Sequence, residues 1–304
     1  MTDAMTDAKI QPAAPLLTAP IAMPSEMPAN GSVVRLSVIV ITKNEAQRLP
    51  TCLASVAFAD ELIVVDSFSS DNTAELARAF GARVIVTPDW PGFGRQKQRA
   101  LDAATGDWVL SIDADEWLDI ELANAVRSIC QTNPDAAASG PDGLPSRYAV
   151  ARMSAFCGQW MRAGSWYPDV CLRLFKRGTA RFSADLVHER LLLDGPSAKL
   201  VVLPGLLLHN SMTGLHDAVD KMNRYSSGRA NDLRARGRHG SLGRALGHGL
   251  WAFFRGYVLR RGFLDGRLGF VLAALDGQAS YFRYLKMWLA DRPTPHELPH
   301  PTQR

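Results

Sequence analysis

Asp107-Trp108-Val109-Leu110-Ser111-Ile112-Asp113-Ala114-Asp115-Glu116 is the stretch around which the chain is arranged. Its apolar part, Trp108 to Ile112, predicts a buried strand, and three carboxylates follow at the carboxyl end of that strand. Carboxylates this close together repel one another, and burial raises their pKa values, unless a cation or hydrogen-bond donors compensate them. A divalent metal ion is the simplest compensation that these residues indicate.

Three strand-and-helix units precede this stretch. The predicted strands are Leu36–Ile41, Glu61–Asp66 and Arg83–Val86, and the predicted helices are Ala46–Phe58, Ala74–Phe80 and Gly94–Ala104. This alternation predicts an α/β fold with an open, mostly parallel sheet and helices on both faces. Ligands of such sheets bind beyond the carboxyl ends of the strands, where Asn44, Asp66 and Asp113 fall.

The usual phosphate-binding loops are missing from the sequence. Neither a GxGxxG nor a GxxxxGK[ST] pattern follows the first strand. A dinucleotide-binding fingerprint and a P-loop are therefore excluded. A phosphate-bearing ligand would need another source of positive charge, and a metal ion held by the carboxylates supplies it.

Composition indicates a folded protein with distinct ends. The chain has 304 residues, of which 47% are apolar and 21% charged, enough for one large domain or two modest ones. Residues 1–34, rich in Ala, Pro and Met, predict a disordered leader. We expect an α/β domain over 35–212, a basic amphipathic helical region over 213–292 and a tail over 293–304. The helical pattern runs from Leu215 to about Ala290, with its clearest break at residues 237–243.

Cysteine usage and hydropathy bear on the compartment. The four cysteines form no CxxC pair and no zinc-ligand spacing, which favours a reduced, cytoplasmic setting. No uninterrupted apolar stretch approaches the ~20 residues that span a bilayer. The sequence thus predicts a cytoplasmic protein without a transmembrane helix.

The C-terminal region combines basic and large apolar residues. The basic residues are Arg244, His248, Arg255, Arg260 and Arg261, and they alternate with Leu246, Leu250, Trp251, Phe253, Phe254, Tyr257 and Val258. Such helices can lie at an anionic membrane surface, here the inner face of the cytoplasmic membrane. Two other interpretations remain: the arginines form the solvated rim of a packed helix, or they bind phosphorylated sugars of a lipid-linked acceptor. No nucleic-acid-binding motif accompanies the charge.

Several motifs together resemble glycosyltransferase family 2, the inverting GT-A fold enzymes that use nucleotide sugars. They are Val38 to Glu45, Val65-Asp66-Ser67 with Ser70 to Thr73, Lys97-Gln98 ahead of Ala104 to Asp107, and Asp113-Ala114-Asp115. Further motifs resemble the branch that adds glucose to the lipopolysaccharide inner core. These are Trp166 to Asp169, Arg173-Leu174-Phe175, Val187-His188-Glu189 and Gly262 to Gly266. The resemblance extends from about Arg35 to Trp288.

The resemblance implies roles for the strand-end residues. One acid of the DxD motif would address the ribose side of the donor and the other would bind Mg²⁺ or Mn²⁺. Asp66 would contact the base or ribose, and Lys97 would pair with the diphosphate. The implied donor-binding residues are Thr42, Asn44, Glu45, Asp66, Lys97 and Asp113, and the implied metal ligands are Asp115, Asp113 and His209. Turn and cap chemistry is the alternative interpretation for Thr42, Asn44 and Glu45, and an ordinary partly buried histidine is the alternative for His209.

Inverting transfer also needs a general base that removes the proton of the acceptor hydroxyl. Many family members carry a Glu-Asp pair where this chain has His188-Glu189, so the assignment stays open. We expect Glu189 to be the base, with His188 orienting it or contacting phosphate. Asp169 is the second candidate.

The resulting expectation is a metal-dependent inverting hexosyltransferase. It would move glucose from UDP-glucose to a lipopolysaccharide inner-core acceptor, a lipid-linked oligosaccharide at the inner membrane surface. Two rivals are a transferase that acts on a polyprenyl phosphate or another surface glycan, and a noncatalytic nucleotide-sugar-binding scaffold.

Overall fold

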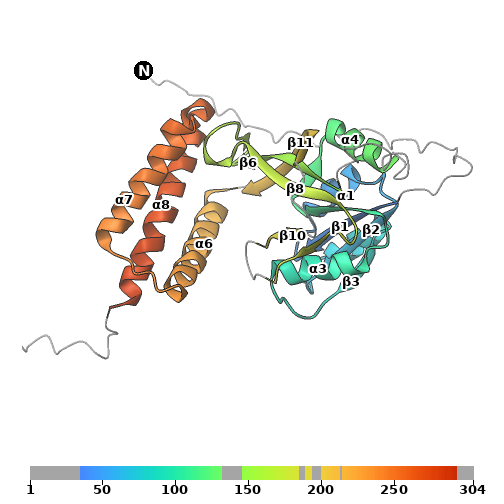
Figure 1. The fold of residues 1–304 in the computed structure, drawn as a ribbon, viewed down its shortest axis with the longest axis horizontal. Helices are drawn as coiled ribbons and strands as arrows, with labels where there is room; N and C mark the ends of the chain where they lie inside the picture. Colours follow the sequence, from blue (N-terminus) through green and yellow to red (C-terminus); the bar gives the residue numbers. More distant parts are fainter. Residues whose placement is uncertain (1–34, 132–145, 185–188, 194–199, 213, 293–304) are drawn as a thin grey trace, which may run out of the picture. The chain divides into compact units, whose positions relative to one another are not determined.

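A computed structural model describes residues 35–131, 146–184, 189–193, 200–212 and 214–292. The predicted leader and tail, and His188, lie outside these residues. Among them, nine strands form one sheet in the order β3-β2-β1-β4-β8-β6-β11-β5, with β7 paired to β6 (Figure 1). Its strands are β1 (Leu36–Thr42), β2 (Glu61–Asp66), β3 (Arg83–Val86), β4 (Trp108–Asp113), β5 (Glu116–Leu118), β6 (Arg147–Phe156), β7 (Gln159–Trp160), β8 (Asp169–Lys176) and β11 (Val201–Met212). A separate two-stranded sheet joins β9 (Ala180–Phe182) to β10 (Leu191–Leu193).

The first half of the sheet is parallel, as predicted. β1 lies between β2 and β4, and β3 pairs with β2 on the outside. The register sets Thr42 opposite Asp66 and Ile41 opposite Asp113, so the polar strand ends meet at one edge. The α/β fold class is therefore confirmed.

The second half of the sheet is mixed. β8 runs antiparallel to both β4 and β6, whereas β11 runs parallel to β6 and antiparallel to β5. The short strand β5 was not expected from the sequence. It begins at Glu116, so Ala114 and Asp115 form a tight turn between two strands of the same sheet.

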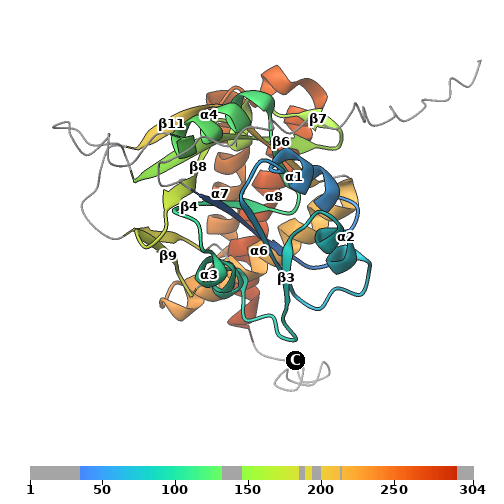
Figure 2. The ribbon, with the colours of Figure 1, turned by 90° about the vertical axis from the view of Figure 1, so that its right-hand side faces the viewer.

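Helices cover both faces of the parallel half, because alternate residues of β1 point to opposite sides. Val38 and Val40 pack in a core with residues of α1 (Leu49–Ser55), α2 (Thr73–Ala79) and α4 (Ile120–Gln131). Ile39 and Ile41 pack in a second core with α3 (Phe93–Ala103). Figure 2 shows α1 and α4 on one side of the strands and α3 on the other.

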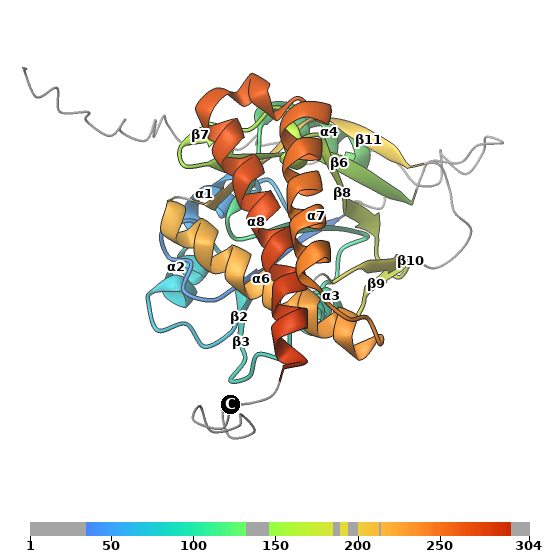
Figure 3. The same ribbon diagram turned by 90° about the vertical axis from the view of Figure 1, so that its left-hand side faces the viewer.

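The predicted C-terminal helical region is present. It contains α6 (Leu215–Ala235), α7 (Leu242–Phe254), a π-helical turn η2 (Arg255–Leu259), a 3-10 turn η3 (Gly262–Asp265) and α8 (Gly266–Ala290). The break between α6 and α7 spans residues 236–241, so the predicted break at 237–243 extends two residues into α7. Figure 3 shows α8 between α6 and α7. A small core of Phe156, Met161, Ala218 and Leu272 joins these helices to the end of β6.

Candidate active site

The ends of β1 and β2 hold a buried carboxylate. Asp66 is 1% exposed, and its Oδ1 accepts a hydrogen bond of 2.9 Å from the Thr42 hydroxyl. The backbone N–H of Ser69 donates to its other oxygen at 2.9 Å. The structure thus brings the predicted donor residues Thr42 and Asp66 together, and Asp66 is fixed by one donor at the end of β1 and one in the loop after β2.

Asn44 and Glu45 tie the loop after β1 to the loop after β2. Asn44 has a left-handed backbone with φ 56°, and its side-chain oxygen accepts from the N–H of Ser70 at 2.7 Å. The N–H of Glu45 donates to the Thr73 hydroxyl, and its carboxylate pairs with Arg48 at 3.1 Å. Burial raises the pKa of Glu45 despite that arginine. Both residues therefore shape the loop, which is the turn chemistry considered as the alternative.

Asp113 is compensated by two cations of the chain itself. Lys97 on α3 lies 2.7 Å from its Oδ1, and Arg173 on β8 lies 3.0 Å from its Oδ2. Burial would raise the pKa of Asp113, but the charges of Lys97 and Arg173 hold it well below the usual range. Burial lowers the pKa of Lys97, but the charges of Asp113 and Glu189 raise it by more than burial lowers it. Lys97 therefore stays an ammonium. The charge at Asp113 therefore does not by itself require a metal ion.

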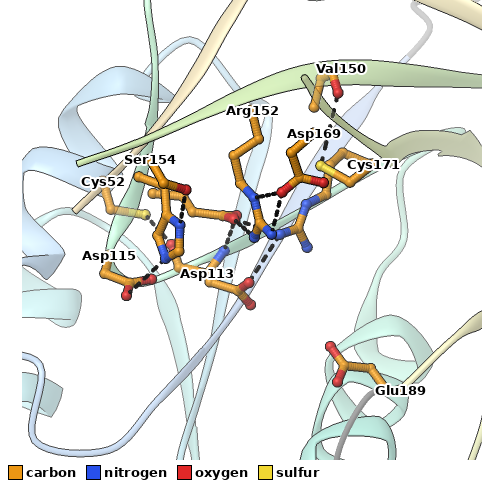
Figure 4. A network of polar contacts seen from close by, with 12 residues as sticks. Cys52, Asp113, Asp115, Val150, Arg152, Ser154, Asp169, Cys171 and Glu189 are labelled. Atoms are coloured by element: carbon orange, nitrogen blue, oxygen red, sulfur yellow. Dashed lines mark hydrogen bonds and ion pairs between the residues drawn. The ribbon is translucent and has the colours of Figure 1, made fainter. Parts of the chain in front are cut away.

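Glu116, the acid after the DxD motif, organises the arginines. Its side chain is fully buried and accepts from Arg173 at 2.6 Å and from Arg152 at 2.9 Å. Its second oxygen accepts from the backbone N–H of Asp113 at 2.9 Å. Arg152 also lies 2.7 Å from Asp169, the second candidate base (Figure 4). A fully buried carboxylate without such partners would be strongly destabilising.

Asp115 faces a different partner from Asp113. His209 Nε2 on β11 lies 3.3 Å from Asp115 Oδ2, and His209 Nδ1 lies 2.9 Å from the Ser154 hydroxyl (Figure 4). Asp113 is turned toward Lys97 and Arg173 instead. Of the three predicted metal ligands, the structure therefore brings Asp115 and His209 together.

The Asp115–His209 pair fits a divalent cation. Two ligands of one octahedral ion, each at about 2.1 Å, lie about 3 Å apart, close to the observed spacing. In the tautomer that binds metal through Nε2, Nδ1 carries the proton and donates to Ser154, which fixes the ring. Within the described residues, no group of three or more His, Cys, Asp or Glu side chains forms a ready metal site. The remaining ligands would have to be water and diphosphate oxygens, as is common for such ions.

Glu189 joins the acids of β4 through a shared lysine. Lys97 Nζ donates to Glu189 Oε1 at 2.6 Å while contacting Asp113. Glu189 comes from the segment between β9 and β10, and in Figure 4 it lies apart from the arginine cluster. One buried ammonium therefore connects the donor motif to the expected base.

Three residues of this site were not predicted: Glu116, Arg152 and Arg173. Glu116 directly follows the DxD motif, and Arg173 begins the Arg173-Leu174-Phe175 motif. Their positions in the sequence therefore already indicated that they belong to the site. Arg152 had a weaker signal, a charged residue within an otherwise apolar strand pattern. A buried charge needs a partner, but its identity depends on which strands become neighbours.

Comparisons with known proteins agree with the motif analysis. The family model for glycosyl transferase family 2 matches residues 37–149. An uncharacterized glycosyltransferase of Rickettsia prowazekii, RP128, is 32% identical over 266 residues, covering 83% of this chain and 86% of the relative. The lipopolysaccharide core biosynthesis glycosyltransferase LpsC of Rhizobium meliloti is 29% identical over 262 residues, covering 82% of this chain and 93% of LpsC.

Two solved structures are similar over parts of their length. Glucosyl-3-phosphoglycerate synthase from Mycobacterium tuberculosis, in complex with Mn²⁺, UDP and glucosyl-3-phosphoglycerate, matches 40% of this chain and 44% of its own, with 27% identity and a TM-score of 0.31. TarS residues 1–349 of S. aureus match 83% of this chain and 91% of their own, with 16% identity and a TM-score of 0.40.

Proposed function

This chain belongs to glycosyltransferase family 2, and from that premise we propose that it moves a hexose from a nucleotide-sugar donor to a lipopolysaccharide inner-core acceptor. The chain is thus a glycosyltransferase, and the proposal concerns its donor and acceptor. UDP-glucose is the proposed donor. The similarity to LpsC over most of both chains supports the lipopolysaccharide acceptor.

The observation that carries the proposal is the meeting of two chain segments at Lys97. Asp113 marks the carboxyl ends of the parallel strands, where nucleotides bind in α/β sheets. Glu189 comes from a later segment and contacts the same ammonium. A donor bound over Asp66 and Asp113 would place its diphosphate within reach of Lys97, which is also paired with the Glu189 carboxylate.

Each residue then has a proposed task. Asp66 and Thr42 hold the nucleoside, and Lys97 attracts the diphosphate. The oxygen of the acceptor hydroxyl attacks the anomeric carbon of the donor sugar, and the nucleoside diphosphate leaves. Glu189 accepts the proton that this hydroxyl loses. Asp169 remains the second candidate base. His188 lies outside the described residues, and its role stays a prediction.

Asp115 and His209 would hold Mg²⁺ or Mn²⁺. When bound, such an ion neutralises charge on the leaving diphosphate. The proposed enzyme is metal-dependent for this reason. Asp113, by contrast, would act on the donor through its position beside Lys97.

The proposed acceptor is lipid-linked, which places the enzyme at the inner face of the cytoplasmic membrane. Among the described residues, no helix is long and apolar enough to cross a bilayer. The proposed contact with the membrane is peripheral.

A donor and acceptor screen tests this function. Purified protein would be incubated with UDP-glucose or another nucleotide sugar and with a truncated core acceptor, and nucleotide release would be measured. We expect release with UDP-glucose that depends on the core acceptor and on Mg²⁺ or Mn²⁺. Release with a polyprenyl phosphate instead of the core acceptor would favour the rival transferase.

Base variants refine the test. Glu189→Gln should bind donor normally and slow transfer about 10²- to 10⁴-fold, the usual contribution of a general base. Asp169→Asn is the matched comparison. If the Asp169 variant is the slower one while Glu189→Gln transfers at the normal rate, the base assignment moves to Asp169.

A further inference from the structure

α7 packs against α8 through its smallest residues. The buried residues of α7 are Ala245 and Gly249, and Gly256 is buried in the following turn. A Cβ atom at Gly249 would lie only 3.0 Å from the Tyr281 Cβ and 3.2 Å from the Gly277 carbonyl oxygen. The two helices therefore approach closely along a small-residue face.

The large apolar side chains of the same segment point away from the protein. Leu250 is 71% exposed and Trp251 is 53% exposed. We name as the α7 face the exposed apolar residues Leu242, Leu246, Leu250, Trp251, Phe254, Val258 and Leu259. Of the apolar residues predicted for membrane contact, Phe253 and Tyr257 are instead partly buried and contact Phe270 of α8.

This arrangement is the reverse of that of a helix surrounded by water. A surface helix of a globular protein buries its large apolar residues and exposes its polar ones. Small residues at the helix contact and large apolar residues outside are typical of helices surrounded by lipid, because lipid is as apolar as a leucine side chain. The packing of α7 therefore indicates apolar surroundings on its outer side.

The charges around the α7 face indicate which apolar surroundings these are. Arg244, Arg255, Arg260, Arg261 and Arg267 are all exposed in this segment. Asp265 is the sole acidic residue between Ser241 and Leu275 in the sequence. Its carboxylate is turned inward, where it accepts from the N–H groups of Arg162 and Ala163. The outer surface is thus apolar and cationic, which complements an anionic bilayer.

A hollow lies at the end of the α7 face. It has a volume of about 510 Å³ and is lined by Tyr257, Phe263, Gly266, Arg267, Phe270 and Val271. Phe263 in this lining is 47% exposed, and the neighbouring Leu264 is 66% exposed. Aromatic walls with an arginine suit a phospholipid whose acyl chain lies against the aromatic rings and whose headgroup phosphate pairs with Arg267.

We propose that the α7 face lies in the interfacial plane of an anionic phospholipid bilayer, with its apolar side chains among the acyl chains and its arginines at the phosphates. This membrane contact rests on the proposed function, because it would bring the enzyme to its lipid-linked acceptor. It adds to that function the protein surface that binds the membrane and the class of lipid that this surface contacts. α7 has 13 residues, fewer than the roughly 20 that span a bilayer, so it would lie along the surface.

Vesicle flotation with the full chain tests the proposal. The protein should float with phosphatidylcholine vesicles that contain phosphatidylglycerol, and much less with phosphatidylcholine alone. Leu250→Asp should lower the partition coefficient about ten-fold or more, because a charge replaces a leucine that the proposal places among the acyl chains. Ile120→Asp is the matched control, since Ile120 on α4 is 78% exposed and lies outside the α7 face. Arg267→Gln should weaken binding to the anionic vesicles but not to phosphatidylcholine vesicles. Arg78→Gln is its control and should change neither.

Two results would overturn the proposal. One is unchanged flotation of Leu250→Asp. The other is a stable dimer in light scattering that Leu250→Asp dissociates, because a second copy of the chain would then cover the face. Transfer to a water-soluble, delipidated acceptor separates this proposal from the proposed function. Leu250→Asp should leave that transfer unchanged, and an absence of transfer by the unmodified protein would contradict the function while leaving the flotation result intact.

Discussion

Lys97 is a buried cation that two carboxylates share, and its surroundings explain why a lysine can stay charged there. It is 3% exposed, which disfavours the ammonium form. Two carboxylate oxygens stabilise the ammonium form: Asp113 Oδ1 lies 2.7 Å and Glu189 Oε1 lies 2.6 Å from the Lys97 Nζ. Removing one partner from such a group leaves buried charge without compensation, which is far more destabilising than replacing the whole group.

Lys97→Met should therefore lower the free energy of unfolding by about 3 kcal/mol. It should also weaken donor binding, because the proposed cation for the diphosphate is gone. Chemical denaturation and donor titration measure the two effects. Arg95→Met, an exposed position on the same helix, is the control. If the two variants behave alike, Lys97 is an ordinary helical lysine.

Asp115 and His209 make the second prediction at this scale. Asp115→Asn and His209→Ala should each weaken Mn²⁺ binding in the presence of UDP, and Ser154→Ala should weaken it about ten-fold through the orientation of His209. Calorimetry or electron paramagnetic resonance reports the binding. His216→Ala is the matched control, because the His216 side chain is 90% exposed. Equal Mn²⁺ affinity in the two histidine variants would place the metal elsewhere.

At the scale of elements, α3 positions the segment that carries Glu189, the proposed base. Gly94 in its first turn lies against the segment after β9, and a Cβ there would be 1.9 Å from the Ser183 carbonyl oxygen and 3.2 Å from the Glu189 Cβ. Only a glycine allows this approach. The helix that carries Lys97 thus also sets the position of the segment that carries Glu189.

Gly94→Ala should push this segment away from α3. We expect a loss of about 2 kcal/mol in unfolding free energy, typical of overpacking, and slower transfer. Gly228→Ala is the matched control within α6, where nothing lies within 4 Å of the added atom. It should stabilise the protein by about 0.5 kcal/mol through the unfolded chain. Full stability and activity of Gly94→Ala would show that the two segments do not pack this closely.

At the scale of the whole molecule, Asp265 connects the C-terminal helices to the residues after β7. It is 8% exposed, and its two oxygens accept from the N–H groups of Arg162 and Ala163 at 3.0 and 2.9 Å. Its carbonyl also accepts from Gln159 at 2.9 Å. The turn that carries the hollow and the edge of the sheet are therefore held together by one carboxylate.

Asp265→Asn should destabilise the protein by about 2 kcal/mol, because the amide nitrogen cannot accept the bond that the replaced oxygen accepted, so one of the two N–H groups loses its partner. The other N–H group then donates to a neutral amide oxygen instead of a carboxylate. Thermal unfolding followed by tryptophan fluorescence measures the loss. Asp232→Asn at an exposed position of α6 is the control and should leave the unfolding free energy unchanged. A neutral effect of Asp265→Asn would mean that the junction depends on the apolar core of Phe156 and Leu272 alone.

The sequence by itself determined the parallel half of the sheet and the edge where the site lies. Strand and helix patterns are local: β-branched runs such as Leu36–Ile41 and the polar residues after them are readable without knowledge of neighbours. Arg83–Val86 was even predicted with its observed bounds. The acids at the strand ends followed from the same reading.

Only the tertiary structure decided how the acids are compensated and which way α7 faces. Each acid is paired with residues from other elements. Asp113 pairs with Lys97 on α3 and Arg173 on β8, Glu116 with Arg173 and with Arg152 on β6, and Asp115 with His209 on β11. Ion pairing depends on distances between segments remote in sequence, which no local pattern contains. Likewise the sequence showed that α7 is basic and apolar, but the small residues that contact α8 are what turn its large apolar side chains outward.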